Sequence, residues 1–171
     1  MARTEYLLHQ QLELVLASLM PANRHACEVS LHTGLRISDV LVLKTEDVRR
    51  SSRFWVKEQK TGKSKLVGLP ASLRGRMIAQ AGPVFVFSNR LDPMKHRTRQ
   101  AVWSDLKRAQ WAFRLPQNVG PHSMRKEYAV ELMRKYGSVE KVRRALNHKS
   151  TTVTLLYAMA DQLLEVSRGV K

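Results

Sequence analysis

Arg125 follows His122 by three residues, in a stretch whose pattern is typical of a helix. On a helix the two side chains project from one face, so an imidazole and a guanidinium can meet the same phosphate. His148 stands 23 residues after Arg125, and Tyr157 follows nine residues later. Phosphoryl transfer without a metal needs a nucleophile, a proton carrier and fixed cations around phosphorus. These residues therefore indicate phosphoryl transfer with a phenol as the nucleophile.

The charge of the chain favours a polyanionic partner. Lysine and arginine number 30 against 14 aspartates and glutamates, which gives a net charge of +16 and a pI near 10.7. Residues 1–47 hold four basic and six acidic side chains, whereas residues 49–104 hold thirteen basic ones and two acidic ones, Glu58 and Asp92. The basic residues are spread over several predicted elements and do not line one amphipathic face. This distribution favours nucleic acid over an anionic membrane.

The positions of apolar residues and helix breakers predict a mainly helical chain. Helices are expected over residues 5–20, 23–32, 38–43, 70–80, 98–113, 122–136, 139–146 and 151–166. Alternation predicts a β-hairpin of strands 54–57 and 65–69 with a basic tip, and residues 84–87 are expected to add a third strand. Asn23 is the expected cap of the second helix, and Arg36 is expected at the turn entering the third. We therefore expect one α+β domain over residues 1–171, mainly helical with a small antiparallel three-stranded sheet.

Five segments, in this order along the chain, resemble the boxes of the tyrosine recombinase (phage integrase) family. They are Thr33-Gly34-Leu35-Arg36-Ile37-Ser38-Asp39, Lys60-Thr61-Gly62-Lys63, His122-Ser123-Met124-Arg125, Leu146-Asn147-His148 and Tyr157. The resemblance covers roughly residues 5 to 165, at spacings typical of the family. It implies the DNA breaking-rejoining fold. It also implies the catalytic domain of a site-specific recombinase that cleaves and rejoins DNA through a 3′-phosphotyrosine, without metal, ATP or another cofactor.

The resemblance also assigns roles. The implied catalytic set is Arg36, Lys60, His122, Arg125, His148 and Tyr157. The two arginines would hold the non-bridging oxygens of the scissile phosphate and offset the charge of the transition state. Lys60 would protonate the leaving 5′-hydroxyl, with Lys63 as the alternative general acid. The histidines would hydrogen-bond the phosphate or accept the proton of Tyr157, which attacks phosphorus. Asp39, three residues after Arg36, would hold that guanidinium in place.

Double-stranded DNA is the implied partner, and the family suggests a homo-oligomer, a tetramer, on the DNA. Basic residues outside the catalytic set are expected to contact the DNA backbone, and they are Lys63, Lys95, Arg97, Arg99 and Lys107. The apolar stretch at residues 163–166 is expected to dock on a neighbouring protomer, with packing onto its own core as the alternative.

Two features depart from the family pattern. Asn147 stands where many members have glycine, a replacement that asparagine suits because it tolerates left-handed backbone geometry. Most members also have a helical core-binding domain before this region. We expect residues 1–171 to form the catalytic domain alone, without that N-terminal domain.

Each residue also has an ordinary explanation. Tyr157 lies in an apolar stretch and could be a packing residue, and lysines at a hairpin tip are usually solvated. At the level of function, the alternatives are a DNA-binding remnant of the same fold, a type IB topoisomerase-like relaxing enzyme and a basic RNA-binding protein. The combined order and spacing of the segments favours the recombinase.

Other features exclude further classes of protein. The single cysteine, Cys27, cannot form an internal disulfide and is expected in the core. The histidines outside the catalytic set, at 9, 25, 32 and 96, lack metal-ligand spacing, so no metal is expected. No stretch of eighteen apolar residues and no secretory leader is present in the sequence. We therefore expect a cytoplasmic protein, bacterial or phage-encoded, with no membrane association.

Overall fold

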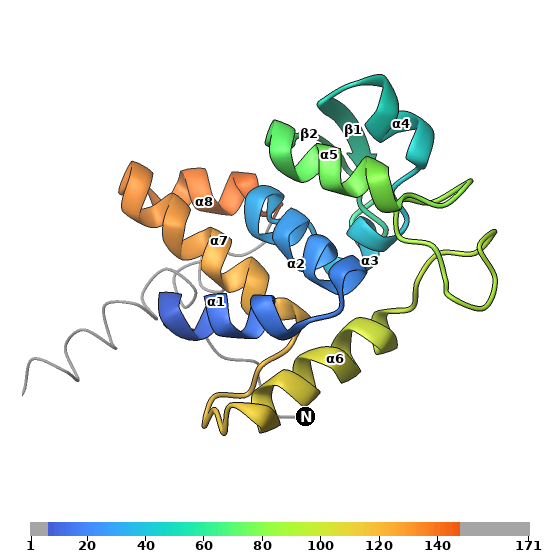
Figure 1. The fold of residues 1–171 in the computed structure, drawn as a ribbon. Coiled ribbons are helices and arrows are strands. Elements are labelled where there is room, and N and C mark those ends of the chain that lie inside the picture. The colour runs from blue at the N-terminus through green and yellow to red at the C-terminus, as the bar shows by residue number, and fades with distance from the viewer. Residues whose placement is uncertain (1–6, 148–171) are drawn as a thin grey trace, which may run out of the picture.

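The computed structural model describes residues 7–147, a range with helices throughout and one β-hairpin. In chain order the elements are α1 (His9–Ser18), α2 (Pro21–Thr33), α3 (Ile37–Leu41), α4 (Thr45–Arg50), β1 (Arg53–Lys57), β2 (Ser64–Gly68), α5 (Ala71–Gln80), α6 (Arg99–Ala112), α7 (Pro121–Tyr136) and α8 (Val139–Ala145). Figure 1 shows the hairpin with α4 and α5 on one side of α2, and α7 with α8 on the other. The fold is therefore mainly helical, as predicted.

Helix α2 is the central element, because it contacts α1, α3, α5, α6 and α7. It begins at Pro21, whose missing N–H costs nothing in a first turn, and it ends at Gly34 with a left-handed φ of 66°. Cys27 is buried in this helix, as predicted. Its burial, together with the nearby Asp105 and Glu28 carboxylates, raises the pKa of the thiol. The thiol is thus an uncharged core group.

Strands β1 and β2 form an antiparallel hairpin in which Arg53 pairs with Gly68 and Lys57 with Ser64. Phe54 and Val56 of β1 are buried while their neighbours are exposed, which is the period of two expected for a sheet with one solvated face. The residues that connect the strands, 58–63, form the tip, as predicted. The tip, with Lys60 and Lys63, therefore lies at the end of the hairpin opposite the pair Arg53 and Gly68.

The predicted third strand is wrong, and the described sheet has two strands. Residues 84–87 instead pair with the connection between α3 and α4, through an isolated bridge between Lys44 and Phe85. The consecutive residues Val86 and Phe87 are both buried, so this segment lacks the alternation of a strand that covers one face. The apolar run belongs to the core and does not extend the hairpin.

Most predicted helices have the expected bounds. Helices α5, α6, α7 and α8 begin and end within one residue of the predictions, and Thr98 caps α6 by accepting from the Ala101 N–H at 3.1 Å. The predicted cap of α2 is wrong, since Met20 is the N-cap and Asn23 lies inside the helix. Helix α4 was not predicted, because six residues are too few to show a helical period. The helix predicted over 151–166 lies outside the described residues.

Candidate active site

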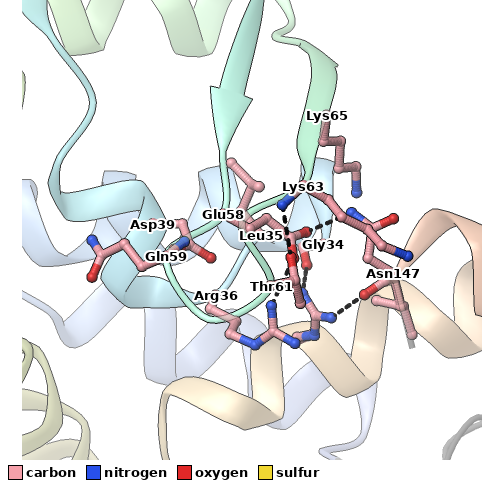
Figure 2. Close-up of polar contacts among 12 residues, drawn as sticks. Gly34, Leu35, Arg36, Asp39, Glu58, Gln59, Thr61, Lys63, Lys65 and Asn147 are labelled. Carbon is pink, nitrogen blue, oxygen red and sulfur yellow. Dashed lines mark hydrogen bonds and ion pairs between the residues drawn. The ribbon is translucent and has the colours of Figure 1, made fainter. Parts of the chain in front are cut away.

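Arg36 and Glu58 form the ion pair around which the candidate site is arranged. Arg36 is the N-cap of α3, at the turn where it was predicted. Its Nη1 donates to Glu58 Oε2 at 2.8 Å, and the Glu58 side chain is completely buried while 16% of the Arg36 side chain remains exposed. Figure 2 shows the guanidinium directed toward the hairpin tip. Arg36 therefore joins α3 to the end of β1.

The Glu58 carboxylate has two further partners. The Thr61 hydroxyl donates to Oε2 at 2.9 Å, and the Asn147 amide donates to Oε1 at 3.0 Å. Burial by itself raises the pKa of Glu58, but the hydrogen bonds from Asn147, Thr61 and Arg36 outweigh it and lower that pKa. Glu58 is therefore an ionised carboxylate inside the protein, shared by α3, the hairpin tip and the turn after α8.

Asn147 has the left-handed backbone that the sequence suggested, with a φ of 52°. It follows Leu146, the C-cap of α8, and its side chain reaches Glu58 (Figure 2). His148 is the next residue in the sequence. His148 and Tyr157, both predicted to be catalytic, lie outside the described residues.

Arg125 on α7 is almost fully buried, with 3% of its surface exposed. One of its terminal nitrogens donates to the Gly34 carbonyl, and the other donates to the Leu146 carbonyl at 2.5 Å. Gly34 lies two residues before Arg36, and Leu146 lies next to Asn147. The structure thus brings the two predicted arginines to one region, linked through the ends of α2 and α8.

Asp39 does not have the partner that was predicted for it. The Arg36 guanidinium pairs with Glu58 and not with Asp39, although its charge acts on the Asp39 carboxylate and opposes the rise of its pKa. The buried Asp39 carboxylate accepts instead from the Gln59 N–H at 2.9 Å and thereby fixes the hairpin tip to α3. Burial raises the pKa of Asp39, and the nearby Glu58 charge adds to that effect. Its role is to place the tip that carries Lys60.

His122 lies in the first turn of α7, one turn before Arg125. Partial burial lowers the pKa of His122, and the charges of Arg125, Arg36, Arg99 and Lys60 lower it further. These four cations come from α7, the N-cap of α3, the start of α6 and the hairpin tip, so charges from separate segments act on the imidazole. A neutral imidazole at neutral pH can accept a proton or a hydrogen bond.

The two lysines proposed as general acid are both exposed at the hairpin tip. The charge of Lys60 is among those that lower the pKa of His122. Lys63 contributes its backbone carbonyl to the Glu58 N–H at 2.9 Å. These contacts favour Lys60 as the lysine that faces the site.

Lys65, which was not predicted, lies beside these residues. Its ammonium donates to the Thr33 carbonyl at 2.5 Å and the Ala145 carbonyl at 2.6 Å, so it joins the C-terminal ends of α2 and α8. Burial and the charge of Arg125 lower the pKa of Lys65 to about 8, against the opposing effect of Glu58. The lysine holds the two segments that supply the carbonyl partners of Arg125.

The residues predicted to contact DNA differ in how firmly the protein engages them. Lys95 pairs with Asp92 at 2.9 Å, and Arg97 donates from Nε to Asn23 at 2.5 Å. Lys107 donates to Gln110 and Asn118, at 2.7 and 2.5 Å, across the loop after α6. Arg99 begins α6 with an exposed side chain. Arg99 therefore combines an exposed side chain with a charge that lowers the pKa of His122.

The arrangement can hold a phosphate between two guanidinium groups. Arg125 is fixed by backbone carbonyls and Arg36 by a buried carboxylate, so both cations are positioned before an anion binds. Within residues 7–147 no group of three or more histidine, cysteine or carboxylate side chains has metal-binding geometry. Over the same residues no helix combines the length and apolar character of a membrane span.

A family model gives the broadest comparison. The model described as the phage integrase family matches residues 5–163. The integrase of Escherichia phage P2 is 29% identical over 155 residues, which cover 91% of this chain and 43% of the phage protein. The tyrosine recombinase XerD of Mycobacterium leprae is 30% identical over 166 residues, or 88% of this chain and 52% of XerD. The chain thus spans about half the length of these two relatives.

Solved structures share the fold. XerH site-specific recombinase bound to difH substrate, as a post-cleavage complex, matches with a TM-score of 0.72 and 22% identity, over 98% of this chain and 53% of XerH. The catalytic domain of bacteriophage HP1 integrase has a TM-score of 0.66 at 16% identity and covers 98% of this chain and 96% of that domain. A lambda integrase tetramer bound to a Holliday junction has a TM-score of 0.73 at 18% identity, over 92% of this chain and 48% of lambda integrase.

Proposed function

The chain belongs to the phage integrase family, and from this premise we propose that residues 1–171 form the catalytic domain of a site-specific DNA recombinase. It cleaves and rejoins DNA strands through a 3′-phosphotyrosine and needs neither a metal nor ATP. The observation that carries this proposal is the convergence of three separate elements, which are the start of α3 with Arg36, helix α7 with His122 and Arg125, and the hairpin tip. A DNA-binding remnant would have no use for such an arrangement.

In the proposed cleavage step the two guanidinium groups bind the non-bridging oxygens of one phosphodiester. A guanidinium can present two parallel N–H groups to a phosphate, and fixed donors stabilise the additional charge of the transition state. Because Arg125 and Arg36 are held by backbone carbonyls and by Glu58, they need little reorganisation when the phosphate arrives. These two residues supply the electrostatic stabilisation that a metal supplies in other phosphoryl transferases.

The proposed nucleophile is Tyr157, whose hydroxyl oxygen forms a bond to phosphorus while the bond to the 5′-oxygen breaks. The phenolic proton passes to His122 or His148, and Lys60 protonates the departing 5′-oxygen. Rejoining reverses these transfers with a different 5′-hydroxyl. The phosphotyrosine retains the bond energy of the phosphodiester, so no nucleotide cofactor is consumed.

Double-stranded DNA is the proposed partner, bound through exposed basic residues such as Arg99. The net charge of +16 supports it, since phosphate contacts by lysine and arginine dominate DNA affinity. We propose a tetramer on DNA, as in the lambda integrase structure with a Holliday junction. The place of action would be the cytoplasm of a bacterial cell, where its DNA lies.

A covalent-trapping experiment tests the proposed function. The protein is incubated in EDTA with a pool of nicked duplexes of randomised core sequence, from which a short cleaved piece diffuses away and prevents rejoining. We expect a denaturation-resistant, protease-sensitive DNA adduct, because the phosphotyrosine bond is covalent. The pool is needed because the catalytic residues do not indicate which bases the protein recognises.

The matched control is Tyr157→Phe, which removes one hydroxyl oxygen. It should bind DNA and form no adduct. An adduct of equal yield with Tyr157→Phe, or none with the unchanged protein across the pool, would overturn the proposal. Relaxation of supercoiled plasmid without joining of two DNA molecules would favour the topoisomerase-like alternative.

A further inference from the structure

We propose that Glu58 is a positioning residue whose buried carboxylate holds Arg36 in the orientation that binds the scissile phosphate. This inference rests on the proposed recombinase function and names a residue outside the predicted catalytic set. Glu58 is completely buried, and its side chain is bound by Arg36, Thr61 and Asn147 (Figure 2). It would act through Arg36 and without touching DNA.

The place of Glu58 in the hairpin argues for a functional role. Phe54 and Val56 alternate with exposed residues along β1, and position 58 continues this alternation toward the core. An apolar residue is the ordinary occupant of such a position. A buried ion pair is weak evidence for stability, because well-packed apolar residues often replace it without loss. The carboxylate is therefore explained better by its effect on Arg36 than by its contribution to folding.

The geometry leaves the rest of Arg36 available. Its Nη1 bonds to Glu58, whereas Nε and Nη2 have no hydrogen bond to any residue in the described range 7–147. The Arg36 side chain keeps 16% of its surface exposed, although the carboxylate it binds is fully buried. With one corner of the guanidinium fixed, the other N–H groups can bind two phosphate oxygens in parallel.

Glu58 also connects Arg36 to the other catalytic segments. Its backbone N–H donates to Lys63 at 2.9 Å and its carbonyl accepts from Gly62 at 2.8 Å, which closes the tip around Lys60. Asn147, the residue before His148, bonds to the same carboxylate at 3.0 Å. Displacement of the carboxylate would therefore release Arg36 from both neighbouring segments.

Cleavage kinetics under single-turnover conditions test the proposal, with the trapping substrate described above and with DNA at saturation. We expect Glu58→Ala to lower the cleavage rate constant about 100-fold, because small misplacement of a catalytic group costs about that much. The Kd for DNA should change less than about twofold, since Arg36 keeps its charge. Glu58→Gln, which retains one acceptor oxygen, should recover part of the rate.

A sulfur substrate separates the route through Arg36 from a route through Lys60. When sulfur replaces the bridging 5′-oxygen, the leaving thiolate needs no proton. The defect of Lys60→Ala should then disappear, whereas the defect of Glu58→Ala should persist. Recovery of Glu58→Ala on the sulfur substrate would overturn the assignment to Arg36.

Val56→Ala is the matched control for stability, because Val56 is buried on the same strand and its side chain has no hydrogen-bonding group. Below the unfolding temperature of both proteins, it should cleave at the unchanged rate. An equal rate loss in Val56→Ala, or full activity of Glu58→Gln and Glu58→Ala, would overturn the proposal. If the unchanged protein itself forms no Tyr157-dependent adduct, the proposed function fails, which is a different result from a fully active Glu58 variant.

Discussion

Lys65 shows how a single residue beside the site can make the stability of the fold depend on pH. Its ammonium lies between the carbonyls of Thr33 and Ala145, where backbone dipoles at two helix ends attract a positive charge. Burial and Arg125 nevertheless lower the pKa to about 8 from the ordinary 10.5. The folded protein therefore releases this proton at a lower pH than the unfolded chain does.

The sign of the resulting pH dependence follows from proton linkage. Between pH 8 and 10.5 the unfolded chain binds more protons at Lys65, so its contribution to the free energy of unfolding rises with pH across that window. Below about pH 8 both states are protonated and the unfavourable contribution is complete. We expect the difference in the free energy of unfolding between the unchanged protein and Lys65→Met to change by about 3 kcal/mol from the lower to the upper end of this pH window.

Urea denaturation at several pH values across that window measures this difference. Subtraction of the Lys65→Met values removes the titration of the other lysines and tyrosines. A difference that stays flat, or that falls with rising pH, would contradict the assignment of the shift to Lys65.

Sequence reasoning proposed Arg36, Lys60, His122 and Arg125 as site residues and did not include Glu58. The first four belong to recognisable segments, whereas Glu58 acquires its role from partners 22 and 89 residues away in the chain, Arg36 and Asn147. One signal was present, since Glu58 is one of two acidic residues among thirteen basic ones in residues 49–104. An isolated acid in a basic segment, two residues before Lys60, could have been recognised as a partner for a cation.

At the scale of elements, the junction from α2 to α3 is the most constrained part of the site. Gly34 has a φ of 66°, and a Cβ there would lie 2.4 Å from the Tyr128 ring. Its carbonyl accepts from Arg125, and Arg36 follows two residues later. Glycine is needed at this junction both for the backbone and for the packing of α7 against α2.

We expect Gly34→Ala to lower the free energy of unfolding by about 3 kcal/mol, as the sum of left-handed strain and a steric clash. Gly137→Ala is the matched control. Gly137 ends α7 with a φ of 59°, and among the described residues no atom outside its chain neighbours and local helix backbone lies within 4 Å of the position that an added Cβ would take. The control should therefore lose only about 1 kcal/mol, from backbone strain alone.

Chemical denaturation of both variants provides the measurement. Equal losses would show that the Tyr128 ring moves aside without cost. The cleavage rate of Gly34→Ala should also fall, because the Arg125 partner shifts, while that of Gly137→Ala should not.

The elements themselves were predictable where the chain carries strong start and stop signals. Thr98 before α6, Pro121 at the start of α7 and Gly137 after it mark helix ends that the structure has. Residues 84–87 resembled a strand because a short apolar run fits a strand and a buried core segment equally well. Their pairing with Lys44 depends on the tertiary fold, which periodicity does not encode.

At the scale of the whole molecule, the basic charge is divided between residues that hold the fold and residues left for a partner. Arg97 and Lys107 are bound by Asn23 and by Gln110 and Asn118. Arg99 is exposed at the start of α6 and acts electrostatically on His122. Sequence alone treated these cations as equivalent, and the structure distinguishes them.

We expect Arg99→Ala to reduce the slope of log K against log salt for DNA binding by about 0.9, the value of one lost phosphate contact. Arg97→Ala should lower thermal stability more clearly than it changes that slope, because its Nε bonds to Asn23. Fluorescence anisotropy with a labelled duplex at several salt concentrations measures the slopes. An unchanged slope in Arg99→Ala would remove Arg99 from the DNA surface.

The long reach of the contacts around Glu58 and Arg125 has a consequence for protein synthesis. Arg125 bonds to a carbonyl 91 residues earlier, and Asn147 to a carboxylate 89 residues earlier. On the ribosome, the groups that fix the two guanidiniums are complete only after residue 147 has left the exit tunnel. We expect nascent chains that end before residue 147 to leave DNA intact, because neither guanidinium then has its full set of fixed partners.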